Sequence, residues 1–182
     1  MKNLNEYLKY YFLEEYLFKE VSVNFQKNGY LTAEEFFAII IWKSNRNKTG
    51  IRKSVKNLIG KNMTIRKITE SIDSDKKDID RVKRLTGIKG VGISIASAIL
   101  TVCYPNNFTI ADYRAKNSLK NFFGQKEENI DYSTPEAYLN YASICINLAK
   151  NNKIKLRNFD RILWGMDFYE GFGGLKELTK DL

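Results

Sequence analysis

The sequence is most informative at residues 85–100, which read LTGIKGVGISIASAIL. A Gly-Val-Gly turn separates two apolar segments of helical spacing, residues 76–85 and 93–103, which predicts two helices joined by a tight hairpin. Gly90 and Gly92 can both adopt positive φ and bring bare amide groups close to a ligand. The second helix would begin there, and its free N–H groups and positive dipole end favour a phosphate oxygen. This stretch therefore predicts a sequence-independent grip on a nucleic-acid backbone.

The rest of the chain also predicts helices, without a strand pattern or an internal repeat. Helices are expected at residues 4–18, 33–44, 52–59, 64–72, 113–123, 135–149 and 158–169. Residues 24–30 and the basic residues 150–157 are expected to be connections, and Gly60 is expected to end a helix. The expected N-caps are Thr32 with Glu35 in a capping box, Ser74 or Asp75, Asp112, Thr134 before Pro135, and Asn158.

Length and composition favour a folded helical protein. The 182 residues are 43% hydrophobic and 13% aromatic, which is enough to bury a substantial core. We expect one all-α domain over residues 1–182, built as two helical lobes around a cleft, with the helix-hairpin-helix at about residues 76–103. The net charge of +9 favours a polyanionic partner or an anionic membrane surface.

The positive charge is concentrated in one part of the chain. Residues 43–69 contain nine basic residues and no acidic one, so this stretch alone equals the net charge of +9. The stretch includes Lys43 and Arg46. It is either the solvated face of a Lys-rich chain or, together with the hairpin, part of one electrostatic footprint for nucleic acid.

Cysteine and histidine usage argues against metal chemistry. Cys103 and Cys145 lie far apart in apolar helical patterns, which favours buried, reduced thiols in a cytoplasmic protein. The chain has no His, so we expect no zinc site, no iron–sulfur cluster and no cofactor. The N-terminus lacks a signal-peptide pattern and no apolar run approaches the roughly 20 residues of a membrane span, so we expect no membrane partner.

The hairpin and the carboxylate that follows it resemble the helix-hairpin-helix of the DNA glycosylase superfamily that includes endonuclease III. The resemblance is carried by Ile88-Lys89-Gly90-Val91-Gly92-Ile93-Ser94-Ile95-Ala96 and by Phe108-Thr109-Ile110-Ala111-Asp112. It implies that Asp112 is the catalytic carboxylate and that duplex DNA is the partner. Ser94 stands where bifunctional relatives have a lyase-active Lys, which implies a monofunctional enzyme.

A second resemblance covers more of the chain. Its marks are Leu31-Thr32-x-Glu34-Glu35, Ile41-Trp42-Lys43-x-x-Arg46, the hairpin, Asp112-x-Arg114-Ala115 and Asp160-Arg161-x-Leu163-Trp164. Together they are similar to a family of small bacterial proteins with a glycosylase-like hairpin, and they imply no particular reaction.

Asp112 is the candidate for catalysis. A fixed carboxylate can stabilise an oxocarbenium-like state and activate water during cleavage of an N-glycosidic bond. Asp112 is equally suited to be a helix N-cap, and the two roles are compatible. Arg114 can pair with Asp112 or with a second carboxylate, or it can hold a phosphate. Ser94 is interpreted as an ordinary helical residue facing the hairpin and not as a nucleophile, because the chain has no His and no obvious base to activate it.

Base flipping also requires an aromatic pocket. The candidates are Trp42, Tyr113 and Trp164, with Phe168 and Tyr169 as further ones, although aromatic residues at helical spacing are more often core. The DNA contacts are assigned to Lys89, Gly90, Gly92, Ser94, Lys43, Arg46 and Arg114. The sequence thus predicts a monomeric, monofunctional DNA glycosylase. The alternatives are a non-catalytic DNA-binding module of the same fold, in repair or defence, and a protein that docks an acidic partner.

Overall fold

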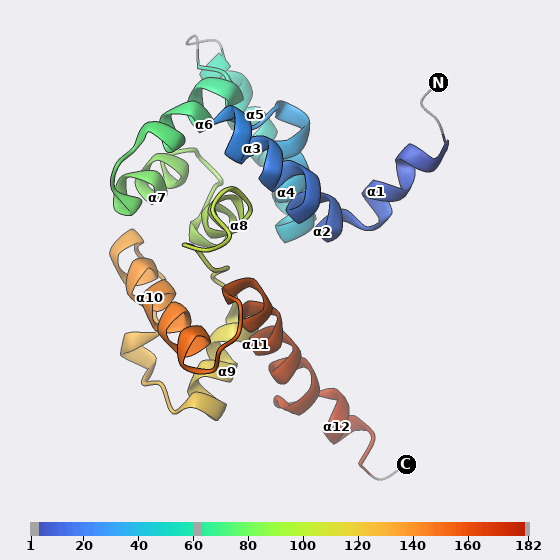
Figure 1. Cartoon of the computed structure of the whole chain (residues 1–182), viewed down its shortest axis with the longest axis vertical. Coiled ribbons are helices and arrows are strands. Elements are labelled where there is room, and N and C mark those ends of the chain that lie inside the picture. The colour runs from blue at the N-terminus through green and yellow to red at the C-terminus, as the bar shows by residue number, and fades with distance from the viewer. Residues whose placement is uncertain (1–3, 60–62, 181–182) are drawn as a thin grey trace. The chain divides into compact units, whose positions relative to one another are not determined.

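The fold is all-α, as predicted from the sequence (Figure 1). A computed structural model describes residues 4–59 and 63–180, and these ranges contain helices and turns but no strand. The chain divides into two units, Met1–Tyr104 and Pro105–Leu182. The hairpin belongs to the first unit and Asp112 to the second, so each is described within its own unit. The single domain and the cleft between two lobes stay predictions.

The first unit begins with short helical segments in place of the long helix predicted at residues 4–18. They are a 3-10 turn (Leu4–Tyr7), α1 (Leu8–Tyr11), α2 (Leu13–Tyr16), a π-helical turn (Leu17–Val21) and α3 (Ser22–Asn28). The long helix was wrong because Phe12 leaves helical geometry, with φ −93° and ψ 51°. The loop predicted at residues 24–30 was also wrong. Phe25 is buried and holds α3 to the core, and α3 continues until Gly29, which ends it with φ 73°.

The next helices follow the predicted order. α4 (Ala33–Ser44) starts with the predicted capping box of Thr32 and Glu35. A 3-10 turn (Asn45–Asn47) leads into α5 (Lys48–Ile59), and α6 (Ile65–Ser74) is capped by Thr64. Gly60, which was predicted to end a helix, lies outside the described residues.

The two hairpin helices are α7 (Asp78–Thr86) and α8 (Ile93–Cys103), close to the predicted ranges. α8 is seen nearly end-on between α4 and α7 in Figure 1, and all its residues from Ile95 to Cys103 are buried. The cap predicted at Ser74 or Asp75 was wrong. Ser74 belongs to α6, the Asp75 carboxylate binds Arg84, and α7 starts after Lys77 without a side-chain cap. Because α8 is buried, it holds the hairpin to the core of the first unit.

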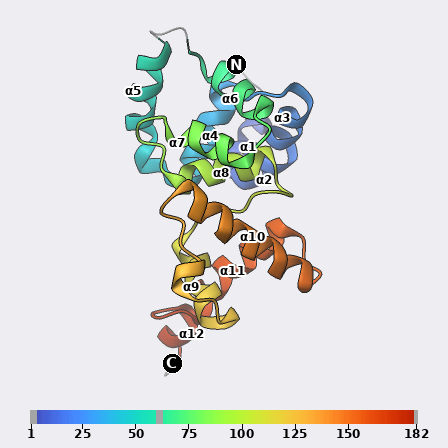
Figure 2. The same ribbon diagram turned by 90° about the vertical axis from the view of Figure 1, so that its left-hand side faces the viewer.

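The second unit consists of α9 (Tyr113–Phe123), a 3-10 turn (Glu127–Asn129), α10 (Pro135–Asn151), α11 (Leu156–Glu170) and the short α12 (Leu175–Leu178). α11 packs against both α9 and α10 (Figure 2). Asp112 and Thr134 are N-caps, as predicted. The basic connection is shorter than predicted because Lys153, with φ 56°, turns the chain tightly. α11 therefore begins at Leu156 after Lys155, and Asn158 lies inside it, so the predicted Asn158 cap was wrong.

Both cysteines are buried free thiols, as expected for core residues. Burial raises the pKa of the Cys103 thiol and of the Cys145 thiol. Within residues 4–59 and 63–180, no helix combines the length and the apolar character needed to cross a membrane.

Candidate nucleic-acid interface

The hairpin alternates buried and exposed residues. Ile88 and Val91 are buried, whereas Lys89, Gly90 and Gly92 are exposed. The Val91 N–H donates to the Ile88 carbonyl at 2.9 Å and closes the turn. The apolar pair therefore holds the turn to the core, while the lysine and both glycines face outward.

The two glycines serve different purposes. Gly90 has φ 94°, a conformation that L side chains rarely adopt, so the predicted positive φ is confirmed there. Gly92 was expected to be able to take positive φ as well, but its backbone is extended, with φ −82° and ψ 176°. A Cβ on Gly92 would have no atom within 4 Å. Gly90 is needed for the shape of the turn, and Gly92 leaves open space in front of α8.

α8 begins at this open space. The Gly92 carbonyl accepts from the N–H groups of Ile95 and Ala96, so the Ile93 and Ser94 amides precede the first hydrogen bonds of the helix. Gly92, the N-cap, has no side chain to cap them. Ser94 is half-buried, and its carbonyl accepts from Ser97 Oγ. The start of α8 therefore offers uncapped amides at an accessible point.

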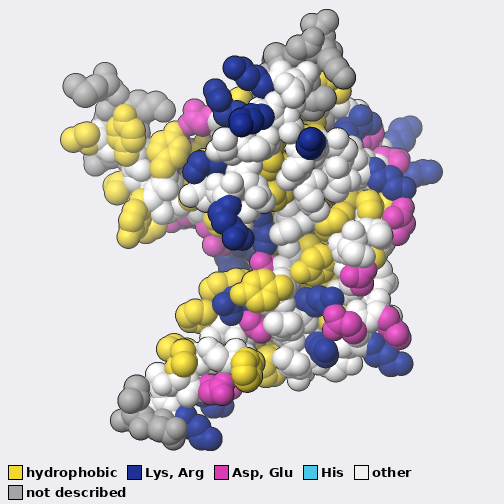
Figure 3. Space-filling model, turned by 180° about the vertical axis from the view of Figure 1, so that it is seen from behind, with side chains coloured by type: hydrophobic (Ala, Val, Ile, Leu, Met, Phe, Trp, Pro, Cys, Tyr) yellow, Lys and Arg dark blue, Asp and Glu magenta, His cyan; other side chains and the backbone are white. Residues whose placement is uncertain are grey.

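α5 lies directly against the hairpin. A Cβ on Gly90 would approach Ile51 Cγ1 to 3.3 Å. Ile51 and Val55 form the buried side of α5, whereas its four basic side chains are all exposed: Lys48, Arg52, Lys53 and Lys56. Figure 3 shows Lys and Arg side chains gathered over the upper part of one face of the molecule. The fold thus brings the acid-free stretch and the hairpin together, although they are about 40 residues apart in sequence.

We call this surface the basic hairpin face and define it by Lys48, Arg52, Lys53, Lys56, Lys89, Gly90 and Gly92. The other basic residues of the stretch from 43 to 69 are not counted as part of this face. Arg46 is exposed in the turn before α5, and Lys43 is half-buried near the end of α4. Arg66 lies over the Tyr30 ring and pairs with Glu70 at 2.7 Å, so its charge is partly balanced.

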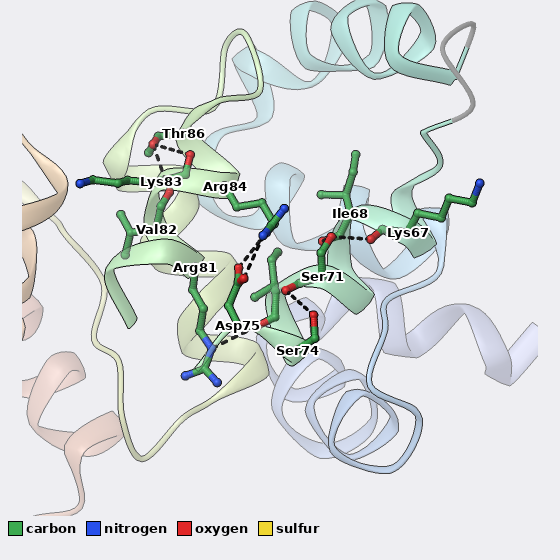
Figure 4. A network of polar contacts seen from close by, with 11 residues as sticks. Lys67, Ile68, Ser71, Ser74, Asp75, Arg81, Val82, Lys83, Arg84 and Thr86 are labelled. Carbon is green, nitrogen blue, oxygen red and sulfur yellow. Dashed lines mark hydrogen bonds and ion pairs between the residues drawn. The ribbon is translucent and has the colours of Figure 1, made fainter. Parts of the chain in front are cut away.

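A polar network fixes α7, the first hairpin helix, to α6 (Figure 4). Arg84 donates two hydrogen bonds to the Asp75 carboxylate, at 2.7 and 2.8 Å, and these lower the pKa of Asp75. Arg81 Nε donates to the Ile72 carbonyl at 3.1 Å. The Arg81 guanidinium also lies over the ring of Tyr104, at the end of α8. Both arginines of α7 therefore hold the hairpin in place and are occupied structurally.

Asp112 lies in the second unit at the start of α9. Its half-buried carboxylate accepts a hydrogen bond from the Arg114 N–H at 3.0 Å, as expected for an N-cap. The chain before it is held by two phenols of α10. Tyr138 donates to the Thr109 carbonyl at 2.8 Å and Tyr141 donates to the Ile110 carbonyl at 3.1 Å. Asp112 is therefore a well-positioned helix cap.

Arg114 pairs with a carboxylate of α11. Its Nη1 lies 3.0 Å from Asp167 Oδ2, and Asp167 is almost fully buried. The ion pair of Arg114 is thus made with a second carboxylate, one of the alternatives that the sequence left open. A spacing of four residues could have revealed Asp167, because Phe159, Leu163 and Asp167 share the buried side of α11, where a carboxylate needs a cation.

The aromatic candidates fall into two groups. Trp42 is half-buried and packs edge-on against Phe18, with ring centroids 5.8 Å apart, as a core residue would. Tyr113 and Trp164 are exposed and belong to the second unit, where Trp164 stacks on Phe168. The stack with Phe168 is a pairing that the sequence did not single out. Tyr169 is exposed near the end of α11.

Lys116 is the basic residue one turn after Asp112. Glu127 forms an ion pair with it and raises its pKa, which favours the charged, non-nucleophilic amine. Across the two described ranges, His, Cys, Asp and Glu side chains form no group of three or more that could hold a metal ion.

The comparisons with protein-family models, curated proteins and solved structures found no match for this chain. The resemblance to helix-hairpin-helix glycosylases therefore stays a prediction. The contact between Ile51 and Gly90 was missed from the sequence, because nothing in the local pattern of α5 indicates which residues it packs against.

Proposed function

We propose that this protein binds duplex DNA without sequence preference through the basic hairpin face. The observation that carries the proposal is the packing of α5 on the hairpin at Ile51 and Gly90. It places an exposed, acid-free basic helix beside an uncapped helix start, and both features attract phosphate.

The proposed interface has two parts with different roles. The Ile93 and Ser94 amides receive one phosphate oxygen at the open space in front of Gly92, which fixes the position of the backbone. The cations of α5 and Lys89 neutralise neighbouring phosphates. Because such contacts reach only phosphates, they position the protein and read no base sequence.

Salt dependence tests the second part. If about five phosphates are neutralised, log affinity falls with log salt at a slope of about −4 to −5. Replacing Lys53 or Lys56 by Ala should make the slope shallower by about 1 for each phosphate that is no longer neutralised. Lys150→Ala is the matched control, because Lys150 is an exposed lysine in the last turn of α10. Affinity that stays flat between low and moderate salt would contradict the proposal.

Gly92 tests the first part. Aspartate and serine are both good N-caps, and the extended backbone and open space at Gly92 accept either side chain. Gly92→Asp should therefore fold normally but weaken DNA binding by tenfold or more, because its carboxylate occupies the amides and repels phosphate. Gly92→Ser caps without charge and should weaken binding less. Equal affinity of the parent and the Asp variant would show that the hairpin is only a structural turn.

Base release is the second candidate function, in which Asp112 makes the protein a monofunctional DNA glycosylase. One observation favours it: the half-buried Asp112 carboxylate is fixed at the start of α9 by the Arg114 N–H, so its position is defined. In this proposal Asp112 stabilises the positive sugar and activates water. Because Ser94 stands where the resemblance to bifunctional glycosylases places the lyase lysine, the expected product is an intact abasic site.

The test presents duplexes with deaminated, oxidised and alkylated bases to the parent and to Asp112→Asn. Asparagine caps a helix nearly as well as aspartate, so fold and DNA affinity should remain. Base release should be lost, and strands should be nicked only after alkali. Release that survives the substitution would remove Asp112 from the mechanism. A parent that releases no base but binds DNA would be the non-catalytic module.

A further inference from the structure

One exposed stripe of α11 combines a cation with aromatic rings. Arg161, Trp164 and Phe168 are spaced i, i+3 and i+7, so they share one side of the helix. Trp164 is 45% exposed and Phe168 is 46% exposed, although large aromatic side chains are normally buried. Arg161 is also exposed, and its Nη1 donates a hydrogen bond to Asn158 Oδ1.

The rings of this stripe are arranged in parallel. The Trp164 and Phe168 ring centroids are 5.3 Å apart and their planes differ by 12°. The Arg114 guanidinium lies 5.4 Å from the Trp164 centroid and 5.8 Å from the Phe168 centroid. Because Asp167 pairs with Arg114 from the buried side, this cation is held beside the rings. The two rings therefore form a stacked, half-exposed pair beside a held cation, which we call the aromatic ledge.

The neighbourhood of the ledge leaves room for a ligand. Gly165 follows Trp164, and a Cβ there would have no atom within 4 Å. Tyr113, 58% exposed, lies beside Arg114 at the start of α9. The open space and this third exposed ring lie on the same unit as the aromatic ledge.

We propose that the aromatic ledge stacks unpaired bases of single-stranded DNA. Flat exposed rings bind any base through its π-face, and cations beside the rings attract the connecting phosphates. The exposed Arg161 and the Arg114 guanidinium place two cationic side chains beside the rings, which favours a polyanion over a basic partner.

This inference rests on the proposed function in one respect only, which is that nucleic acid is the ligand. The two surfaces are in different units and use different chemistry, because the basic hairpin face binds phosphates and the aromatic ledge binds bases. They can therefore succeed or fail separately.

The experiment uses full-length Trp42→Phe protein, in which Trp164 is the single remaining tryptophan of the two. Oligothymidylate, which forms no duplex, is titrated while tryptophan fluorescence and the anisotropy of a labelled oligonucleotide are followed. Stacking on Trp164 should quench its fluorescence with the same midpoint as the anisotropy change. A duplex of equal length is titrated in parallel.

Phe168→Leu removes a flat ring but keeps an apolar side chain. It should weaken oligothymidylate binding about 5- to 150-fold, the range expected for the loss of one stacked base, and should leave duplex binding unchanged. Ile162→Ala is the matched control, because Ile162 is exposed on α11 away from the ledge. Trp164→Leu, followed by anisotropy alone, provides a second variant if Phe168→Leu unfolds.

Four outcomes overturn the inference. Binding of oligothymidylate without quenching would place the bases elsewhere, and equal affinity of Phe168→Leu would show that the ring does not stack. Self-association of the parent that Phe168→Leu abolishes would identify a second copy of the chain as the occupant. Binding of duplex without binding of oligothymidylate would leave the proposed function intact and refute the aromatic ledge. Binding of oligothymidylate without binding of duplex would refute the basic hairpin face and leave the aromatic ledge standing.

Discussion

Gly90→Ala is the sharpest test of the hairpin geometry. The φ of 94° lies outside the region that non-glycine residues occupy, and strain of this kind costs about 1–3 kcal/mol. The new Cβ would also meet Ile51 Cγ1 at 3.3 Å, so α5 must shift by a few tenths of an ångström. Alanine restricts the unfolded chain, which offsets about 0.4–1 kcal/mol of this cost. The net expectation is a loss of about 1–2 kcal/mol in the free energy of unfolding.

The assay is urea unfolding of the full-length protein followed by circular dichroism, with Gly92→Ser as the matched control. Gly92 lies two residues away, has an extended backbone and faces open space, and serine is a favourable N-cap. This control should change the free energy of unfolding by less than about 0.5 kcal/mol. If Gly90→Ala is as stable as the parent, the positive φ and the packing against Ile51 are both refuted.

Three further expectations concern other parts of the chain. Because Arg84 lowers the pKa of Asp75 in the folded state, the pair stabilises the protein above the unfolded pKa of about 3.9 and this contribution is lost as pH falls through the folded pKa. Asp75→Asn should therefore reduce the free energy of unfolding by about 1 kcal/mol or less at pH 7 and by nothing in strong acid, and a pH-independent difference would contradict this. Asp167→Asn should lower the free energy of unfolding by about 1–2 kcal/mol, because it leaves Arg114 without its buried partner. Glu170→Gln breaks an exposed ion pair and should lower the free energy of unfolding much less, with both variants measured by urea unfolding. Cys103 and Cys145 should resist a thiol reagent in the native protein, since burial raises the pKa of each, and both should react in denaturant; fast native labelling would show that either helix opens readily.

Local signals predicted most of the fold. The capping box at Thr32, the N-cap Asp112 and the Thr134–Pro135 start are interactions within four residues, so the sequence contains everything needed to recognise them. The errors have equally physical causes. Residues 4–18 have helical spacing and residues 24–30 are polar, but the break at Phe12 and the continuation of α3 to Gly29 depend on backbone geometry and packing that apolar periodicity does not report.

The candidate site was predictable only in part. The Gly-Val-Gly pattern identified the hairpin, but it could not distinguish Gly90, required for its φ, from Gly92, which leaves space. Gly90 lies against Ile51, and the Arg114 guanidinium pairs with Asp167, 53 residues away. The spacing of buried residues on α11 marks Asp167 as a carboxylate that needs a cation, but which cation it meets, and which residue α5 brings to Gly90, follow from tertiary packing.

The proposed roles are distributed over the two units in a way that mutations can separate. Phosphate binding depends on the basic hairpin face of the first unit, whereas the carboxylate and the aromatic ledge belong to the second. Gly92→Asp should therefore reduce duplex affinity whether or not the protein cleaves a glycosidic bond. Asp112→Asn should abolish base release without changing that affinity, and Phe168→Leu should weaken binding of unpaired bases alone. A glycosylase requires all three contributions, because it must hold the duplex, accommodate a flipped base and stabilise the charged sugar. A non-catalytic binder releases no base with or without Asp112, so base release by the parent and its loss in Asp112→Asn decide between the two candidate functions.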